Sequence, residues 1–366
     1  MKKILVGICG IGNGHLNRQI CVINELKSKG FEVLAVTSMD KISVIKKSCS
    51  IEVLPIVIPW IVCNENGVNF KATLEKYYLS TQDRFKIFLE FSIAVEKYFN
   101  GKPDLVITDY EPNVAEYAYA SNLKLITMEQ QSKFLYLENI KINDFSINEE
   151  INRINYFFPK YDMKIISSFF PIDIKENSVV VVPPIIERLE KRDSEENKVL
   201  VYFSSYSFSK KYFEILNVIK EFKNFEFIVY TKENINNFNK YLNYKNIKFS
   251  NFNNLFKNDL LSASFLITTS GHQLLSEAIS IDLPVITIPL DTYEQNYNAL
   301  MIEKYKLGMK SKDFTYEVLK EFLENRFYFI NNIKDFKNKY YKNNWQETVV
   351  EKVNSVINEW DFDYCW

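Results

Sequence analysis

Short apolar runs alternate with polar loops and with segments of helical spacing along the whole chain. Residues 3–9 form the first run and residues 32–37 form the second. Between them, apolar residues recur at helical spacing from Leu16 to Leu26, and Gly30 provides a signal for the end of a helix. A continuously apolar run bounded by polar loops is typical of a parallel strand covered on both faces. The pattern therefore predicts an α/β protein.

The first half of the chain repeats this unit. Its predicted strands are residues 3–9, 32–37, 51–58, 103–112, 123–128, 163–167 and 179–182. We also expect a long amphipathic helix or helix pair at residues 73–99. Because ligands bind at the carboxyl ends of strands in open α/β sheets, Asp109 and Glu111 are candidate site residues, and so are Gln130 and Gln131 after the next strand.

The second half restarts the same alternation after a break. Its predicted strands are residues 198–203, 225–230, 247–249, 265–268 and 285–288, and its predicted helices are 210–222, 272–280, 316–341 and 347–359. Pro183 and Pro184, followed by a charged run to Asn197, read as a linker between two domains. We place the first domain at residues 1–186 and the second at 187–342.

The first predicted strand runs directly into the loop Gly10-Ile11-Gly12-Asn13-Gly14-His15. A glycine-rich loop between a strand and a helix can bind a dinucleotide, but that use requires an acidic residue at the end of the second strand. This chain has Thr37 and Ser38 there, which argues against a dinucleotide site.

A second strand-to-helix turn lies at Ser270-Gly271. The first N–H groups of a helix lack partners within the helix, and the helix dipole adds positive charge, so such a turn suits a diphosphate. Glu277, further along the predicted helix, could reach a ribose diol, and Glu294 and Gln295 open the next helix beside the same edge. Each of these features also has a plain structural reading as a turn or a solvated helix residue.

Length, charge and cysteine content narrow the class of protein. The chain has 366 residues, enough for two domains, and its net charge of −1 provides no basic field for nucleic acid. Its 5 cysteines are scattered without metal-ligand spacing, which favours a reduced cytoplasmic protein. No segment has the apolar length to span a bilayer. Asp361-Phe362-Asp363 follows the last predicted helix in an aromatic tail, and we assign it no metal.

The block from Phe265 to Gly308 resembles the donor-binding signature of the GT-B nucleotide-sugar glycosyltransferases, which include UDP-glycosyltransferases and MurG-type lipid glycosyltransferases. The matching residues, in order, are Ser270-Gly271, Ser276, Glu277, Pro284, Pro289, Glu294-Gln295, Asn298-Ala299 and Gly308. Ser270 replaces a first glycine, and Glu294 replaces the aspartate of many members, which leaves sugar selectivity open. The run Gly-x-Gly-x-Gly-His-x-x-Arg, Thr108 to Pro112 and Gln130-Gln131 look most like a prokaryotic branch related to MurG.

This resemblance implies two Rossmann-like domains facing across a cleft. The first domain would bind the acceptor, the second would bind the donor, and residues 343–366 would form a helix and tail that return to the first domain. The implied donor-binding residues are Ser205, Ser270, Gly271, His272, Gln273, Ser276, Glu277, Glu294 and Gln295. The implied residues of the acceptor side and its loops are Gly12, Asn13, Gly14, Glu111 and Gln130. Trp60, Tyr77 and Tyr78 are acceptor candidates by position, or else core residues.

The chain contains 2 histidines, His15 and His272, and each opens a predicted helix after a turn that contains glycine. The resemblance places His15 where UDP-glycosyltransferases carry a general base and Asp109 where they carry its orienting carboxylate. A neutral imidazole can take the proton of an attacking hydroxyl, and a carboxylate on the other ring nitrogen fixes the tautomer. Two alternatives stay open: His15 caps the helix or touches phosphate, and Glu111 orients it instead of Asp109. His272 is expected to donate to the diphosphate.

The expected activity is sugar transfer from a nucleoside-diphosphate sugar, UDP-type by resemblance, with inversion and without a metal or other cofactor. The acceptor is left open as a small molecule, a glycan or a lipid-linked sugar. MurG-like relatives allow peripheral contact with the inner face of a membrane, although the clearest basic cluster is only Lys334, Lys337, Lys339 and Lys342. Two other functions remain: a nucleotide-sugar hydrolase or epimerase on the same fold, and a non-catalytic subunit that binds sugar nucleotides.

Overall fold

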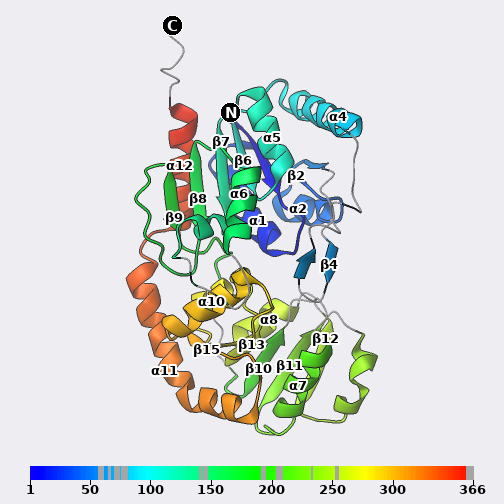
Figure 1. Ribbon diagram of the computed structural model, residues 1–366, viewed down its shortest axis with the longest axis vertical. Helices are drawn as coiled ribbons and strands as arrows, with labels where there is room; N and C mark the ends of the chain where they lie inside the picture. The colour runs from blue at the N-terminus through cyan, green and yellow to red at the C-terminus, as the bar shows by residue number, and fades with distance from the viewer. Residues whose placement is uncertain are drawn as a thin grey trace.

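The computed structural model describes most of the chain in two lobes (Figure 1). The described residues are 1–56, 62–64, 67–69, 75, 81–138, 140, 142, 147–190, 195–202, 209–231, 234–251 and 255–359. Trp60, Tyr77, Tyr78, Ser205 and the tail with Asp361 and Asp363 lie outside these residues, so the predictions made for them are not tested by the structure.

The first lobe is built on a parallel sheet of seven strands in the order β3-β2-β1-β6-β7-β8-β9. Its strands are β1 (Lys3–Ile8), β2 (Glu32–Thr37), β3 (Val53–Pro55), β6 (Leu105–Asp109), β7 (Leu125–Glu129), β8 (Met163–Ser167) and β9 (Val179–Val182). Its helices are α1 (Gly14–Ser28), α2 (Ile42–Cys49), α4 (Thr81–Phe99), α5 (Pro112–Ser121), the 3-10 helix η1 (Gln131–Leu135) and α6 (Ile147–Phe157). A small antiparallel pair, β4 (Val62–Asn64) and β5 (Gly67–Asn69), stands apart from this sheet.

The second lobe contains a parallel sheet of six strands in the order β12-β11-β10-β13-β14-β15. Its strands are β10 (Lys198–Tyr202), β11 (Glu226–Thr231), β12 (Ile247–Asn251), β13 (Phe265–Thr268), β14 (Val285–Thr287) and β15 (Gly308–Lys310). Its helices are α7 (Ser209–Ile219), η2 (Ile235–Tyr241), α8 (Leu255–Ser262), α9 (His272–Ser280), α10 (Tyr293–Lys304) and α11 (Tyr316–Tyr340).

Both sheets reverse their strand order next to their first strand, at β1/β6 and at β10/β13. Connections leave in opposite directions at such a point, which opens a crevice at the carboxyl ends of the strands. The two-domain α/β architecture expected from the sequence is confirmed, and each domain presents one such crevice.

The last helix, α12 (Trp345–Asn358), returns to the first lobe (Figure 1). Its buried residues Trp345, Val349, Val353 and Val356 join the core that β1 and α1 form. A different core cluster joins the lobes, since Phe134, Phe169 and Phe170 of the first pack with residues of α10 and α11. The domains therefore share an apolar interface next to the crevices.

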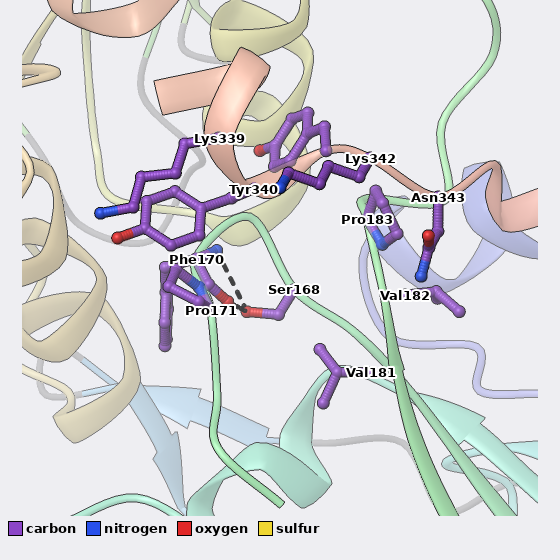
Figure 2. Close-up of a pocket in the computed structure, with 11 residues that line it drawn as sticks. Ser168, Phe170, Pro171, Val181, Val182, Pro183, Lys339, Tyr340, Lys342 and Asn343 are labelled. Atoms are coloured by element: carbon purple, nitrogen blue, oxygen red, sulfur yellow. Dashed lines mark hydrogen bonds between the residues drawn. The ribbon is translucent and has the colours of Figure 1, made fainter. Parts of the chain in front are cut away.

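A pocket of about 270 Å³ lies where α11 leads into α12 (Figure 2). It is lined by Ser168, Phe170, Pro171, Val181, Val182, Pro183 and residues 339–343. None of the site residues predicted from the sequence lines it. Lys339 and Lys342 of the predicted basic cluster lie here, at the crossing between the domains.

Candidate functional site

His15 is held at the start of α1 by the glycine-rich loop after β1. Gly12 has φ +65, a conformation that glycine adopts without strain, and it lets the chain turn sharply into the helix. The His15 Nδ1 atom lies 2.6 Å from Asp109 Oδ1 at the end of β6. With Nδ1–H donating to the carboxylate, Nε2 carries the lone pair that a base needs.

Asp109 is fully buried, and its two carboxylate oxygens accept four hydrogen bonds from three side chains. Besides His15, Arg18 donates from Nη2 to Oδ1 at 2.8 Å and from Nε to Oδ2 at 2.9 Å. Gln19 Nε2 also donates to Oδ2, at 2.9 Å. Burial alone would raise the pKa of Asp109, but the charge of Arg18 and the hydrogen bonds from His15 and Arg18 outweigh burial and hold this pKa below its usual value. Asp109 is therefore a carboxylate.

Glu111 does not contact His15 in this structure. It is the N-cap of α5, where its carboxylate accepts from the backbone N–H of Asn113 and of Val114. Burial raises the pKa of Glu111 to about 7, although these helix N–H groups oppose the rise. Of the two carboxylates that the sequence left as alternatives, the structure puts Asp109 beside the imidazole.

Two further side chains face His15. Gln131 Nε2 lies 3.4 Å from His15 Nε2, and its amide oxygen is buried without a partner in the described part of the chain. The ring of Tyr110 stacks on the imidazole with centroids 6.1 Å apart. Tyr110 has φ +55, an uncommon conformation for a residue with a side chain, directly after Asp109. Tyr110 thus covers one face of the His15 ring, and Gln131 lies beside its Nε2 edge.

The turn between β13 and α9 presents hydrogen-bonding groups without partners among the described residues. These are Thr268 Oγ1, Ser270 Oγ and both ring nitrogens of His272. His272 is only 5% exposed. Burial, with the nearby charges of Lys133 and Arg18, lowers the pKa of His272 well below 6.5, so its ring is neutral and has one N–H to donate. Several unsatisfied buried groups at one helix N-terminus point to a ligand site.

The start of α10 fixes this turn from the other side. Gln295 Oε1 accepts from the backbone N–H of Ser270 at 3.2 Å and of Leu290 at 3.0 Å. Asn298 Nδ2 donates to Ser270 O at 2.9 Å. Gln295 and Asn298 therefore hold the turn in place, whereas the sequence assigned Gln295 to the donor directly.

Polar contacts also cross between the domains at this point. Gln130 Nε2, from the first domain, donates to Glu294 Oε1 at 2.8 Å. The fully buried Lys133 donates to Gln130 Oε1 and, at 3.3 Å, to Asn298 Oδ1. Burial lowers the pKa of Lys133 to about 8. Gln130, placed on the acceptor side by the sequence, thus contacts a predicted donor residue.

The remaining predicted residues lie along α9 and the first loop. Gln273 Nε2 donates to Glu277 Oε1 at 3.1 Å, and burial raises the pKa of Glu277 to about 7. Ser276 is buried, and its hydroxyl donates to His272 O at 2.7 Å within the helix. A Cβ placed on Gly14 would lie 3.7 Å from Gln273 Cβ. The starts of α1 and α9 therefore face each other across the crevice.

The structure brings His15, Asp109, Gln130, Gln273 and Glu294 to the two facing sheet edges. Asn13 occupies the N-cap position of α1, but its exposed side chain makes no capping hydrogen bond and accepts from Lys41 Nζ instead. Gly271 precedes the first residue of α9. The contacts also add residues that the sequence did not assign to the site, namely Arg18, Gln19 and Lys133. Arg18 follows His15 by one helical turn, a spacing that could have revealed it.

No group of three or more histidine, cysteine, aspartate or glutamate side chains gathers within the described residues in a way that could hold a metal ion. No helix in the described ranges is long and apolar enough to cross a membrane.

The chain is similar to glycosyltransferases in sequence pattern and in fold. The family model described as glycosyl transferase family 1 matches residues 2–326. No curated protein sequence matches the chain significantly.

Solved structures share the fold at low sequence identity. Spinosyn forosaminyltransferase SpnP aligns with a TM-score of 0.70 at 12% identity, covering 98% of this chain and 100% of its own. UGT2 of Phytolacca americana, complexed with UDP-2fluoro-glucose and pterostilbene, aligns with a TM-score of 0.70 at 13% identity, covering 97% and 98%. The calicheamicin glycosyltransferase CalG4 aligns with a TM-score of 0.66 at 12% identity, covering 98% and 99%. Because the family model spans most of the sequence, the chain belongs to glycosyl transferase family 1 and is a glycosyltransferase of the GT-B fold.

Proposed function

We propose that this glycosyltransferase moves a sugar from a UDP-type donor to an acceptor hydroxyl with inversion, and that His15 is the general base. The observation that carries the proposal is the 2.6 Å contact between His15 and a buried, ionised Asp109, in the crevice that the start of α9 faces. The proposal assigns the proton transfer to the first domain and the donor to the second.

The donor diphosphate is proposed to bind at the N-terminus of α9. Backbone N–H groups and the helix dipole there favour an anion, and Ser270 Oγ and the His272 ring supply donors that lack partners within the described residues. As the bond to the sugar breaks, these groups stabilise the charge on the leaving diphosphate without a metal. Glu294 is the proposed partner of the sugar hydroxyls, and Glu277 of the ribose. UDP is favoured because UGT2, which shares the fold, is described in complex with a UDP-sugar analogue.

In the proposed reaction the acceptor hydroxyl lies against His15 Nε2 and attacks the anomeric carbon from the face opposite the diphosphate. The proton passes to Nε2 as the new C–O bond forms, and Asp109 stabilises the imidazolium through Nδ1–H. Gln131, which occupies the Nε2 side of the ring, would yield that position to the acceptor or hydrogen-bond it.

A thermal-shift panel of UDP-, dTDP-, GDP- and ADP-sugars tests the donor, because a ligand stabilises the native state according to its occupancy. We expect UDP-sugars to stabilise the protein and His272→Gln to weaken that stabilisation. A preference for another nucleotide would contradict the UDP assignment while leaving the site in place.

Nucleoside-diphosphate release with a panel of phenols, sugars and lipid-linked sugars tests the base. His15→Gln should reduce the rate by roughly 10²- to 10⁴-fold while donor stabilisation persists. EDTA should leave the rate unchanged, and NMR of the product should show an inverted anomer. Cleavage of the donor that is equally fast without any acceptor would favour a hydrolase instead.

A further inference from the structure

Arg18 makes an unusual third member of the His15–Asp109 pair. Its guanidinium donates to both oxygens of Asp109, from Nη2 to Oδ1 at 2.8 Å and from Nε to Oδ2 at 2.9 Å. The same Nη2 also lies 3.1 Å from His15 Nδ1. Arg18 is 2% exposed, so water screens none of these contacts effectively. The same carboxylate oxygen, Oδ1, accepts from both His15 and Arg18.

The charge count of this cluster differs from that of a pair of histidine and aspartate alone. A lone carboxylate beside an imidazole favours the protonated ring, because opposite charges attract at short range. Here the guanidinium cancels the charge of Asp109 before the proton arrives. The cluster is neutral when His15 is neutral and carries a single positive charge after proton transfer.

We propose that Arg18 is a positioning residue that locks the Asp109 carboxylate for His15 and, by neutralising it, keeps the His15 ring unprotonated and ready to accept a proton. This inference rests on the proposed role of His15 as the base. After proton transfer the cluster carries a single positive charge, next to the crevice in which the proposed diphosphate leaves. Arg18 therefore also favours the departure of an anion.

Other charged and titratable groups surround the cluster. Tyr110 directly follows β6, and the buried Cys9 directly follows β1. Glu129 ends β7, the buried Lys133 lies in η1, and Glu294 lies in the first turn of α10. The charges of Asp109, Glu129 and Glu294 together raise the pKa of Arg18 above its usual value, although burial opposes them. Arg18 therefore stays cationic throughout the pH range in which a histidine titrates.

The test uses the small number of histidines in this protein. His15 and His272 are its 2 histidines, so selective labelling with ¹³C-histidine gives two resolvable ring signals, which His272→Gln assigns. Arg18→Gln retains an amide donor for Asp109 but removes the charge. We expect the pH midpoint of the His15 signal to rise by about 1 unit or more relative to the wild type. The matched control is Gln19→Ala, which removes a neutral donor to the same carboxylate. It should shift the pH midpoint of the His15 signal far less.

A second variant separates charge from geometry. Arg18→Lys keeps the positive charge and loses the fork that binds both oxygens, so its His15 midpoint should stay near that of the wild type. Equal shifts in Arg18→Gln and Arg18→Lys, or no shift in either, would overturn the proposal.

If Arg18→Gln does not fold, the double variant Arg18→Gln/Asp109→Asn avoids a buried carboxylate without a charge partner. The pH midpoint of its His15 signal is then compared with that of the single variant Asp109→Asn. His15 should titrate at the higher pH in the double variant, and the reverse order would overturn the proposal. Because the NMR signal does not depend on turnover, a failed titration test is distinguishable from a failed assignment of sugar transfer.

Discussion

Asp109 holds together the part of the site that lies in the first domain. It ends β6, next to the point where the strand order reverses, and its carboxylate accepts hydrogen bonds from His15, Arg18 and Gln19. The resemblance to UDP-glycosyltransferases predicted His15 and Asp109 as a pair, and the sequence left Glu111 as an alternative to Asp109. In an unbroken strand these two side chains would point to the same face. The strand ends at Asp109, and Tyr110 takes a left-handed conformation that turns Glu111 away to cap α5. The left-handed conformation of Tyr110, which the pattern of apolar and polar residues does not indicate, therefore separates the two carboxylates.

Glu111 leads to a prediction about pH. The folded-state pKa of about 7 lies above the ordinary value of 4.5, so the folded protein favours the protonated carboxyl. Its contribution to stability is therefore full at low pH and is lost as the pH rises through about 7. Glu111→Gln removes this titration, and between pH 4.5 and 8 the variant should gain on the order of 2 kcal/mol in unfolding free energy relative to the wild type.

Urea unfolding at a series of pH values measures this difference. Glu116 lies on the same helix but is exposed, so Glu116→Gln is the control and should show no such trend. A constant offset between Glu111→Gln and the wild type at all pH values would mean that Glu111 acts only as a cap.

At the scale of elements, strands were predicted better than short helices. The predicted bounds of β8 and β9 match the structure. β9 is apolar throughout, as is typical of a buried parallel strand, whereas β8 includes the buried Lys164. The sequence prediction missed the helices α2, α5, η1, α6, η2 and α8, and it also missed the short strands β4, β5 and β15. Glu111 followed by Pro112 was a readable helix start, since an acidic N-cap and a proline at the first turn both favour one. The single 3-10 turn η1, which carries Gln131 and Lys133, is too short for periodicity to reveal.

The hydrogen bonds between α10 and the β13–α9 turn lead to a prediction about donor binding. Gln295→Leu removes the acceptor of the Ser270 and Leu290 N–H groups, so the turn should loosen where the donor is proposed to bind. We expect a loss of about 1–3 kcal/mol in stability and roughly tenfold weaker binding of UDP by calorimetry. Glu303→Gln, at an exposed position near the end of α10, should change neither. Unchanged UDP affinity in a destabilised Gln295→Leu variant would show that the turn does not position the donor.

At the scale of the whole molecule, the domain repeat was predictable but the contact between domains was not. Each domain restarts the same alternation of strands and helices, and both sheets follow the same order around a first strand. The interface is made by loops and helix faces that lie far apart in the sequence. For example, Gln130, directly before η1, contacts Glu294 of α10. Which loops meet is decided by how the two sheets are docked, and no local pattern specifies that.

The shared core predicts how the domains unfold. Phe134 of the first domain is fully buried, and its ring packs edge-on against Tyr293 at 5.6 Å and Tyr297 at 6.1 Å between centroids. Such an interface couples the domains, so calorimetry should show one main transition for the wild type. Phe134→Ala should cost roughly 3–5 kcal/mol and separate the transition into two, because the cavity opens between the domains and not within either sheet. Phe327→Ala, at a site that is 63% exposed on α11, should leave the single transition intact. Two unfolding transitions already present in the wild type would mean that the Gln130–Glu294 contact and the apolar cluster around Phe134 are too weak to couple the domains.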